Sequence, residues 1–172
     1  MELIQYFIDN RVAHIVLNRP EKRNALSPQL ISELHTAFIN AEKDDTVKVI
    51  LLKSSGETFC AGADLAYIQQ MQNFTYEQNL EDSLKLKALF ETIYNLKKVI
   101  VAQVEGPAIA GGCGLAFMAD FIFASPKAIF GYSEVNIGFI PAIVSVFLVK
   151  KIGEAAAKHL LLGGFNISAE KA

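Results

Sequence analysis

Hydrophobic and polar positions at the start of the chain predict a β-hairpin. Two apolar stretches, residues 3–8 and 12–17, flank the pair Asp9-Asn10, and Asn18-Arg19-Pro20 follows the second stretch. Asp and Asn favour tight turns between strands, and Pro cannot continue a strand ladder. We therefore expect two antiparallel strands within residues 2–18, ending at the Asn-Arg-Pro segment.

A helix is predicted next. Ser27 is a suitable N-cap, and Pro28 would stand at the first helical position, where its missing N–H costs nothing. Apolar residues then recur at helical spacing and predict the buried face: Leu30, Ile31, Leu34, Phe38 and Ala41.

The rest of the chain alternates between short apolar runs and helical patterns. Strands are expected at residues 47–52, 99–104, 121–124 and 128–130. Helices are expected from Leu65, over 75–96, from the Gly- and Ala-rich segment 108–114, over 143–151 and over 154–162, and a further helix is expected to begin at 168–172. This alternation is typical of an α/β fold, and we interpret residues 1–172 as a single domain whose C-terminal part is missing.

Composition narrows the class of protein. The 172 residues are 52% hydrophobic and 20% charged, with a formal net charge of −2. The basic residues are scattered, so no nucleic-acid-binding stripe is expected. No signal peptide or membrane-spanning run is evident, and Cys60 and Cys113 do not require a disulfide. We therefore expect a soluble, cytoplasmic protein with reduced thiols.

Two loops of small residues each follow a buried strand. The first contains Ala61-Gly62-Ala63-Asp64, and the second contains Ala110-Gly111-Gly112-Cys113-Gly114. Small residues allow a ligand to approach the main chain, and backbone N–H groups at such turns can stabilise a developing oxyanion. The alternative is that they only allow tight packing of helix against strand.

Glu134 is the candidate acid–base group. It lies in an otherwise apolar stretch, where desolvation raises a carboxyl pKa and suits it to proton transfer. The alternative is an exposed loop charge. Asp120 is interpreted as a structural hydrogen-bonding group, and Asp64 as a helix cap.

Other chemistries lack support. His14, His35 and His159 are far apart, and none stands at metal-ligand spacing with a Cys or carboxylate. Neither a nucleophile elbow nor a nucleotide-binding glycine motif occurs. Cys113 is interpreted as a core residue, so we expect no metal and no separate cofactor.

The same segments resemble the crotonase (enoyl-CoA hydratase/isomerase) superfamily along essentially the whole chain. The resemblance rests on five blocks, residues 17–26, 59–65, 106–115, 130–134 and 138–141. It implies a spiral of ββα units in which the N–H groups of Ala63 and Gly111 form an oxyanion hole beside Glu134. The coenzyme A (CoA) arm of the thioester substrate would lie along the remaining binding residues, Lys22, Arg23, Ala25, Ala61, Ala63, Asp64 and Leu65. The resemblance also implies a homotrimer or hexamer built by a C-terminal helical region that this chain lacks.

One position departs from the family pattern. Well-known hydratases carry two glutamates, and the first of these positions is Gly114 here, so that only Glu134 remains. The motifs are most similar to the methylglutaconyl-CoA hydratase-like subgroup, which acts on branched carboxylated enoyl-CoA thioesters. The expected activity is therefore hydration or dehydration with a single glutamate. The alternatives are an enoyl-CoA isomerase or decarboxylase, and a non-catalytic acyl-CoA binder.

Overall fold

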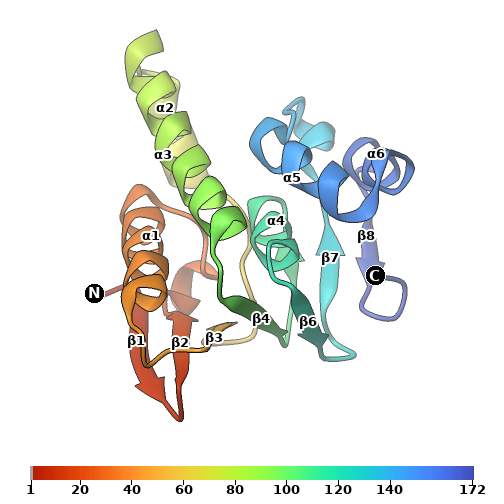
Figure 1. Ribbon diagram of the computed structural model, residues 1–172. Helices are drawn as coiled ribbons and strands as arrows, with labels where there is room; N and C mark the ends of the chain where they lie inside the picture. Colours follow the sequence, from red (N-terminus) through yellow and green to blue (C-terminus); the bar gives the residue numbers. More distant parts are fainter. Residues whose placement is uncertain (1) are drawn as a thin grey trace.

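The larger of two sheets carries most of the core. The computed structural model describes residues 2–172, and its five-stranded sheet has the order β1-β2-β3-β4-β6 (Figure 1). The strands are β1 (Ile4–Asp9), β2 (Val12–Leu17), β3 (Val49–Ser54), β4 (Val99–Val104) and β6 (Phe121–Ala124). β1 runs antiparallel to β2, and every other neighbouring pair is parallel.

A smaller sheet lies beside the larger one and is built from β5 (Ala108–Ile109), β7 (Ile129–Gly131) and β8 (Asn166–Ser168). β5 pairs in parallel with β7, and β7 pairs antiparallel with β8. Because β5 directly precedes the second small-residue loop, this sheet determines where that loop begins.

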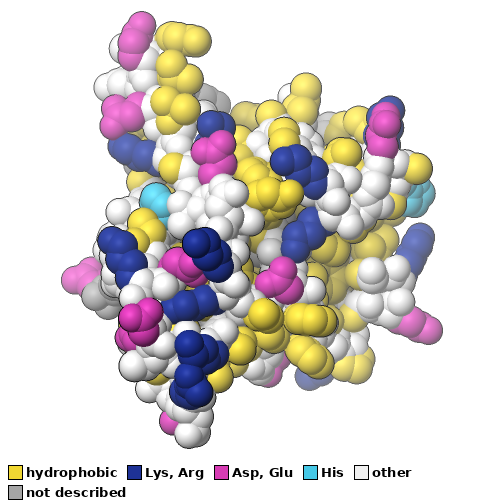
Figure 2. Space-filling view, in the orientation of Figure 1, with side chains coloured by type: hydrophobic (Ala, Val, Ile, Leu, Met, Phe, Trp, Pro, Cys, Tyr) yellow, Lys and Arg dark blue, Asp and Glu magenta, His cyan; other side chains and the backbone are white. Residues whose placement is uncertain are grey.

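Helices pack against one face of the larger sheet, against the smaller sheet and against one another. They are α1 (Pro28–Lys43), α2 (Leu65–Met71), α3 (Tyr76–Asn95), α4 (Gly111–Phe117), α5 (Ala142–Ile152) and α6 (Glu154–Gly163). Leu34 and Phe38 of α1 and Phe90 of α3 are fully buried against sheet residues such as Ile50 and Ala102. On the opposite face Phe121 and Phe123 of β6 remain exposed, and Figure 2 shows apolar side chains gathered in that region.

Local sequence signals for the helices are confirmed. The Ser27 hydroxyl accepts a hydrogen bond from the Leu30 N–H, with Pro28 at the start of α1. The Asp64 carboxylate caps α2 in the same way. Asp120 is structural as expected, since its Oδ2 accepts the Ile100 N–H at 2.8 Å.

Several predicted boundaries were wrong. The hairpin turn is centred on Asn10 and Arg11, which both have positive φ, one residue later than predicted. β3 begins at Val49 because the Val47 N–H is engaged in a turn with the Asp44 carbonyl. The Ala- and Gly-rich segment first forms β5, and helix α4 starts only at Gly111.

The helix predicted to begin at 168–172 is not present in the described chain. Asn166–Ser168 forms β8, which pairs with β7, and residues 169–171 form a turn. Ile167 is buried at 7% exposure, so pairing and burial at the edge of β7 outweigh local helix preference. No helix within residues 2–172 is both long enough and apolar enough to cross a membrane.

Candidate active site

The first small-residue loop presents the N–H of Ala63 outward. Leu26 and Ala63 form an isolated parallel bridge, in which the Leu26 N–H donates to the Gly62 carbonyl at 2.7 Å and the Asp64 N–H donates to the Leu26 carbonyl at 3.1 Å. Successive peptide groups in an extended segment point in opposite directions, so the Ala63 N–H points away from Leu26. Within residues 2–172 it has no hydrogen-bond partner, and Ala63 is exposed.

The second loop presents the N–H of Gly111. The preceding residue, Ala110, has φ 55° and ψ −127°, a conformation that residues with a side chain rarely adopt. It is held there because the Ala110 N–H donates to the Gly131 carbonyl at 2.8 Å while its carbonyl accepts the Gly114 N–H at 3.0 Å. Gly111 is the first residue of α4, so its N–H has no partner inside the helix.

The two loops are in direct contact. Cys60 and Ala108 form a parallel bridge, with the Ile109 N–H donating to the Cys60 carbonyl at 2.9 Å. A Cβ added to Gly62 would lie 3.4 Å from the Gly111 nitrogen. The loops that carry the two predicted donors therefore lie side by side, as the sequence indicated.

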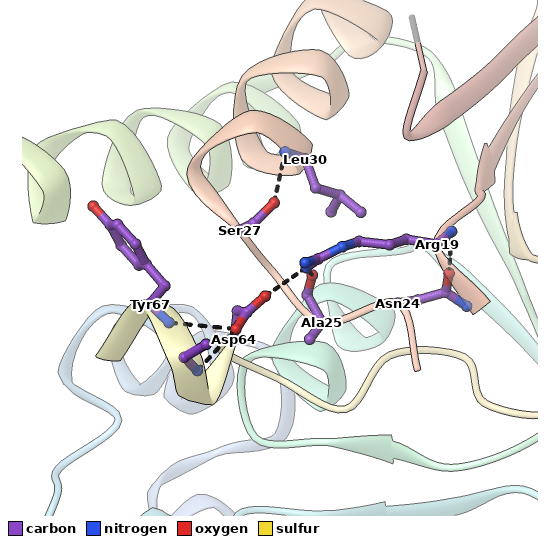
Figure 3. A network of polar contacts seen from close by, with 8 residues as sticks. Arg19, Asn24, Ala25, Ser27, Leu30, Asp64 and Tyr67 are labelled. Carbon is purple, nitrogen blue, oxygen red and sulfur yellow. Dashed lines mark hydrogen bonds and ion pairs between the residues drawn. The ribbon is translucent and has the colours of Figure 1, made fainter. Parts of the chain in front are cut away.

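A polar network around Arg19 and Asp64 fixes the end of the first loop (Figure 3). Arg19 Nη1 contacts Asp64 Oδ2 at 2.6 Å and donates to the Ala25 carbonyl at 3.2 Å. Asp64 Oδ1 accepts the N–H groups of Ala66 and Tyr67. Burial alone would raise the pKa of Asp64, but the hydrogen bonds from Arg19 and from these N–H groups outweigh it and lower the pKa.

Glu134 begins the 3₁₀ helix Glu134–Ile137, which follows β7. Its Oε2 is buried, and this atom has no hydrogen-bond partner in the described chain. Burial raises the pKa of the carboxyl, and its own N–H partly opposes the shift. Glu134 follows Gly131, whose carbonyl holds Ala110, by three positions, so the carboxyl belongs to the segment that shapes the second loop.

Gly114 faces α5 without room for a side chain. An added Cβ would lie 2.5 Å from Val144 Cγ1 and 3.5 Å from Phe90 Cε1. Val144 therefore fills the space into which a side chain at position 114 would project. No local sequence signal pointed to Val144, because the contact joins two separate helices.

The predicted CoA-binding residues divide into two groups. Lys22, Arg23 and Leu65 are exposed, and Ala61 is partly exposed, so these four remain available to a ligand. Ala25 and Asp64 are buried, and the Asp64 carboxylate is engaged by Arg19 and by α2.

The other reactive side chains have structural surroundings. Cys60 and Cys113 are free and buried, and burial raises the pKa of each thiol to about 12. His14 stacks on Phe7 at 4.5 Å between ring centroids, and His35 Nε2 lies 2.8 Å from Thr92 Oγ1. No group of three or more potential metal ligands occurs within residues 2–172.

Sequence reasoning assigned no role to the side chains of Asn24 and Tyr132, and it did not anticipate the backbone conformation of Ala110. Asn24 is fully buried, with its amide bonded to backbone on both sides. The Tyr132 hydroxyl is buried without a partner in the described chain. The pair Arg23-Asn24 could have suggested a turn, but nothing in the sequence indicated where the side chain of Asn24 would bind.

Comparison with known proteins agrees with this geometry. The sequence profile of the enoyl-CoA hydratase/isomerase family matches residues 8–172. The chain is 45% identical over 161 residues to a Thermus thermophilus protein assigned as an enoyl-CoA hydratase, covering 94% of this chain. It is 38% identical over 165 residues to the mitochondrial enoyl-CoA hydratase of Pongo abelii, covering 95% of this chain.

A solved structure gives the same result. A Legionella pneumophila protein assigned as an enoyl-CoA hydratase/isomerase (crotonase) superposes with a TM-score of 0.96 at 42% identity, over 100% of this chain and 66% of the other. The chain spans 64% of the length of the Thermus relative and 55% of the Pongo relative. Profile, sequence identity and structure together show that the chain belongs to the enoyl-CoA hydratase/isomerase family, with the crotonase fold.

Proposed function

We propose that this chain forms the acyl-CoA-binding core of an enoyl-CoA hydratase or dehydratase, and that residues 1–172 act as one domain. One observation carries the proposal. Within residues 2–172 the N–H groups of Ala63 and Gly111 have no hydrogen-bond partner and belong to loops in direct contact, and a buried oxygen of Glu134 that is likewise without a partner lies in the segment that follows β7. Two backbone donors and a desolvated carboxyl are the groups that thioester enolate chemistry requires.

In this mechanism the thioester oxygen accepts hydrogen bonds from the Ala63 and Gly111 N–H groups. Negative charge grows on that oxygen as water adds to the β-carbon, so donors fixed in advance stabilise the transition state more than the substrate. Glu134 takes a proton from the attacking water and then delivers a proton to the α-carbon. Burial raises the pKa of Glu134, which makes its protonated form easier to populate for the second proton transfer.

The CoA arm is placed along the exposed residues of the first loop and of the preceding turn. Lys22 and Arg23 would pair with phosphate groups, and the small side chain of Ala61 would let the arm approach the main chain. The buried residues Ala25 and Asp64 would shape this surface from behind. CoA is then part of the substrate, and the chemistry calls for no separate cofactor.

Gly114 supports a proposal for the substrate class. A site with only one protein carboxylate suits a substrate that itself carries a carboxylate, such as 3-methylglutaconyl-CoA. The substrate carboxylate would assist the water that Glu134 activates. This proposal links the chain to the breakdown of branched-chain acids rather than to that of simple fatty acids.

A second candidate, an enoyl-CoA isomerase or decarboxylase, is favoured by Val144. An added Cβ at Gly114 would lie 2.5 Å from Val144 Cγ1, so a second carboxylate has no room at this position. Moving a double bond or losing carbon dioxide needs the enolate to be stabilised, but it does not need water to be activated by two carboxylates.

The proposed assembly is a homotrimer or a pair of trimers. Apolar residues beside Glu134 are strongly exposed, with Ile137 at 65% and Ile140 at 81%. Exposed apolar groups next to a site favour coverage by another part of the protein or by another subunit. Size-exclusion chromatography with light scattering would give the mass of the assembly.

The test follows the absorbance of the conjugated enoyl thioester with crotonyl-CoA and with 3-methylglutaconyl-CoA. Glu134→Gln is expected to lower kcat by about 10²- to 10⁴-fold, the range of general acid–base catalysis. The matched control is Glu154→Gln, whose side chain is 70% exposed in a surface ion pair with Lys158. Tight thioester binding without hydration of either substrate, in the wild type, would exclude the hydratase and leave the isomerase, the decarboxylase or a binder.

A further inference from the structure

The segment that supports the Ala63 N–H is held by one buried amide. Asn24 is fully buried, and its Oδ1 accepts the Arg19 N–H at 2.8 Å. Its Nδ2 donates to the Ser55 carbonyl at 2.9 Å and to the Thr58 carbonyl at 2.8 Å. Both donor hydrogens and one acceptor site of the amide are therefore used, which a buried amide requires.

This amide keeps the chain in an unfavourable backbone conformation. Arg23 and Asn24 have φ values of 50° and 52°, in the left-handed region. Consecutive left-handed residues with side chains persist only where surrounding contacts fix them. Two of the three bonds of Asn24, to the Ser55 and Thr58 carbonyls, join this turn to the loop after β3, and the third, from the Arg19 N–H, closes the turn itself.

The same turn is the support for the first donor loop. The Ala61 N–H donates to the Arg23 carbonyl at 3.0 Å, the Leu26 N–H to the Gly62 carbonyl at 2.7 Å, and the Asp64 N–H to the Leu26 carbonyl at 3.1 Å. Residues 61–64 are therefore held by backbone hydrogen bonds to residues 23–26. Any rotation of this turn would be transmitted to the peptide that carries the Ala63 N–H.

We propose that Asn24 is a positioning residue for catalysis, which fixes the direction of the Ala63 N–H through the turn of residues 19–26. The inference rests on the proposed oxyanion role of Ala63. Because Asn24 is fully buried, it acts through the turn and not by contact with the substrate. Arg19 bonds to the Ala25 carbonyl and to the Asp64 carboxylate, and so fixes the C-terminal end of the loop of residues 61–64.

Two variants separate positioning from folding. Asn24→Gly accepts the positive φ without strain and removes only the amide. Asn24→Asp keeps the shape but loses both donor hydrogens and faces the Ser55 and Thr58 carbonyls with a carboxylate. The matched control is Leu89→Ala, a cavity in α3 among core residues, which lowers stability without touching this turn.

The decisive readout is the thioester carbonyl itself. Crotonyl-CoA with a ¹³C-labelled carbonyl is bound to the native protein, and the carbonyl stretching frequency is compared with its value in solution. The wild type is expected to lower the frequency, because two N–H donors polarise the bond. Asn24→Gly is expected to return it toward the solution value and to lower kcat by about 10²-fold, the effect of losing one oxyanion donor, with KM changed less than about threefold.

Each outcome is informative. If Asn24→Gly folds and keeps both the wild-type carbonyl frequency and the wild-type kcat, the positioning role is overturned. It is also overturned if the Leu89→Ala control shows the same change in carbonyl frequency as Asn24→Gly. If Asn24→Gly does not fold, Asn24→Asp is judged by the same two criteria. A wild type that leaves the bound carbonyl at its solution frequency overturns the oxyanion role of Ala63 and, with it, the role of Asn24.

Discussion

The Cα of Gly62 approaches Ala110 so closely that a methyl group on Gly62 would lie 2.7 Å from the Ala110 Cβ. The same methyl group would lie 3.0 Å from the Ile109 carbonyl oxygen, and Gly62 has φ 87°. Glycine is thus required here by conformation and by contact, and both requirements come from the meeting of the two donor loops.

Gly62→Ala is expected to lower both stability and activity. The positive φ costs about 1–2 kcal/mol and the overpacking about 1–3 kcal/mol of unfolding free energy. Pushing the loops apart would also displace one donor and lower kcat by about 10²-fold. Gly153→Ala is the control, because Gly153 has φ 80° and an added Cβ there meets nothing within 4 Å. Equal loss of activity in both variants would contradict the account.

Glu134→Gln is expected to change the pH dependence of stability. Burial raises the pKa of Glu134, so the folded protein prefers the protonated carboxyl. The stability contributed by this proton is fully present below the ordinary glutamate pKa of about 4.3 and is lost as the pH rises through the raised value. The glutamine variant cannot ionise and so avoids this loss.

Melting temperatures measured across the pH range check the sign. Glu134→Gln should have a higher melting temperature than the wild type at pH 8. The difference should disappear below about pH 4, where Glu134 is protonated in both the folded and the unfolded wild type. In the wild type, kcat/KM for hydration should fall as the pH decreases through the raised pKa, because the basic form is lost. A variant that is less stable than the wild type at pH 8 would contradict a carboxyl whose charged form is destabilised by burial.

Local signals explain which parts of the fold were predictable. The caps at Ser27 and Asp64 depend on residues within a few positions of each helix start, and both are present. β8 was missed because its pairing with β7 joins distant segments. The same holds for the site. The sequence motifs pointed to both donor loops, whereas the amide of Asn24 binds carbonyls 31 and 34 positions away.

Tyr132→Phe is expected to leave the unfolding free energy unchanged or to raise it by up to about 1 kcal/mol. In the described chain the buried Tyr132 hydroxyl has no partner other than the neighbouring Cys113 thiol, which is only a weak hydrogen-bonding group. Tyr67→Phe is the matched comparison, because the Tyr67 hydroxyl donates to Asp82 Oδ1 at 2.6 Å. Denaturant titrations should show that only Tyr67→Phe destabilises, by about 1 kcal/mol.

Gly114 and Val144 should be strongly coupled. In a helix, alanine is favoured over glycine by about 1 kcal/mol, so Gly114→Ala would stabilise α4 if the space were free. It is not free, because the added Cβ would lie 2.5 Å from Val144 Cγ1 and 3.0 Å from Val144 Cβ, and a β-branched side chain has few rotamers to escape into. Gly114→Ala is therefore expected to destabilise the wild type by about 1–3 kcal/mol.

Shortening the Val144 side chain should reverse the sign of the stability change caused by Gly114→Ala. In a Val144→Ala background the same Gly114→Ala change is expected to stabilise the protein by up to about 1 kcal/mol, since only the helix preference remains. A double-mutant cycle from urea denaturation gives the coupling directly, and an interaction energy of about 1–3 kcal/mol is expected for residues in contact. Additive effects would mean that the two side chains do not compete for one space. The account of Gly114 as a position closed by Val144 would then fail.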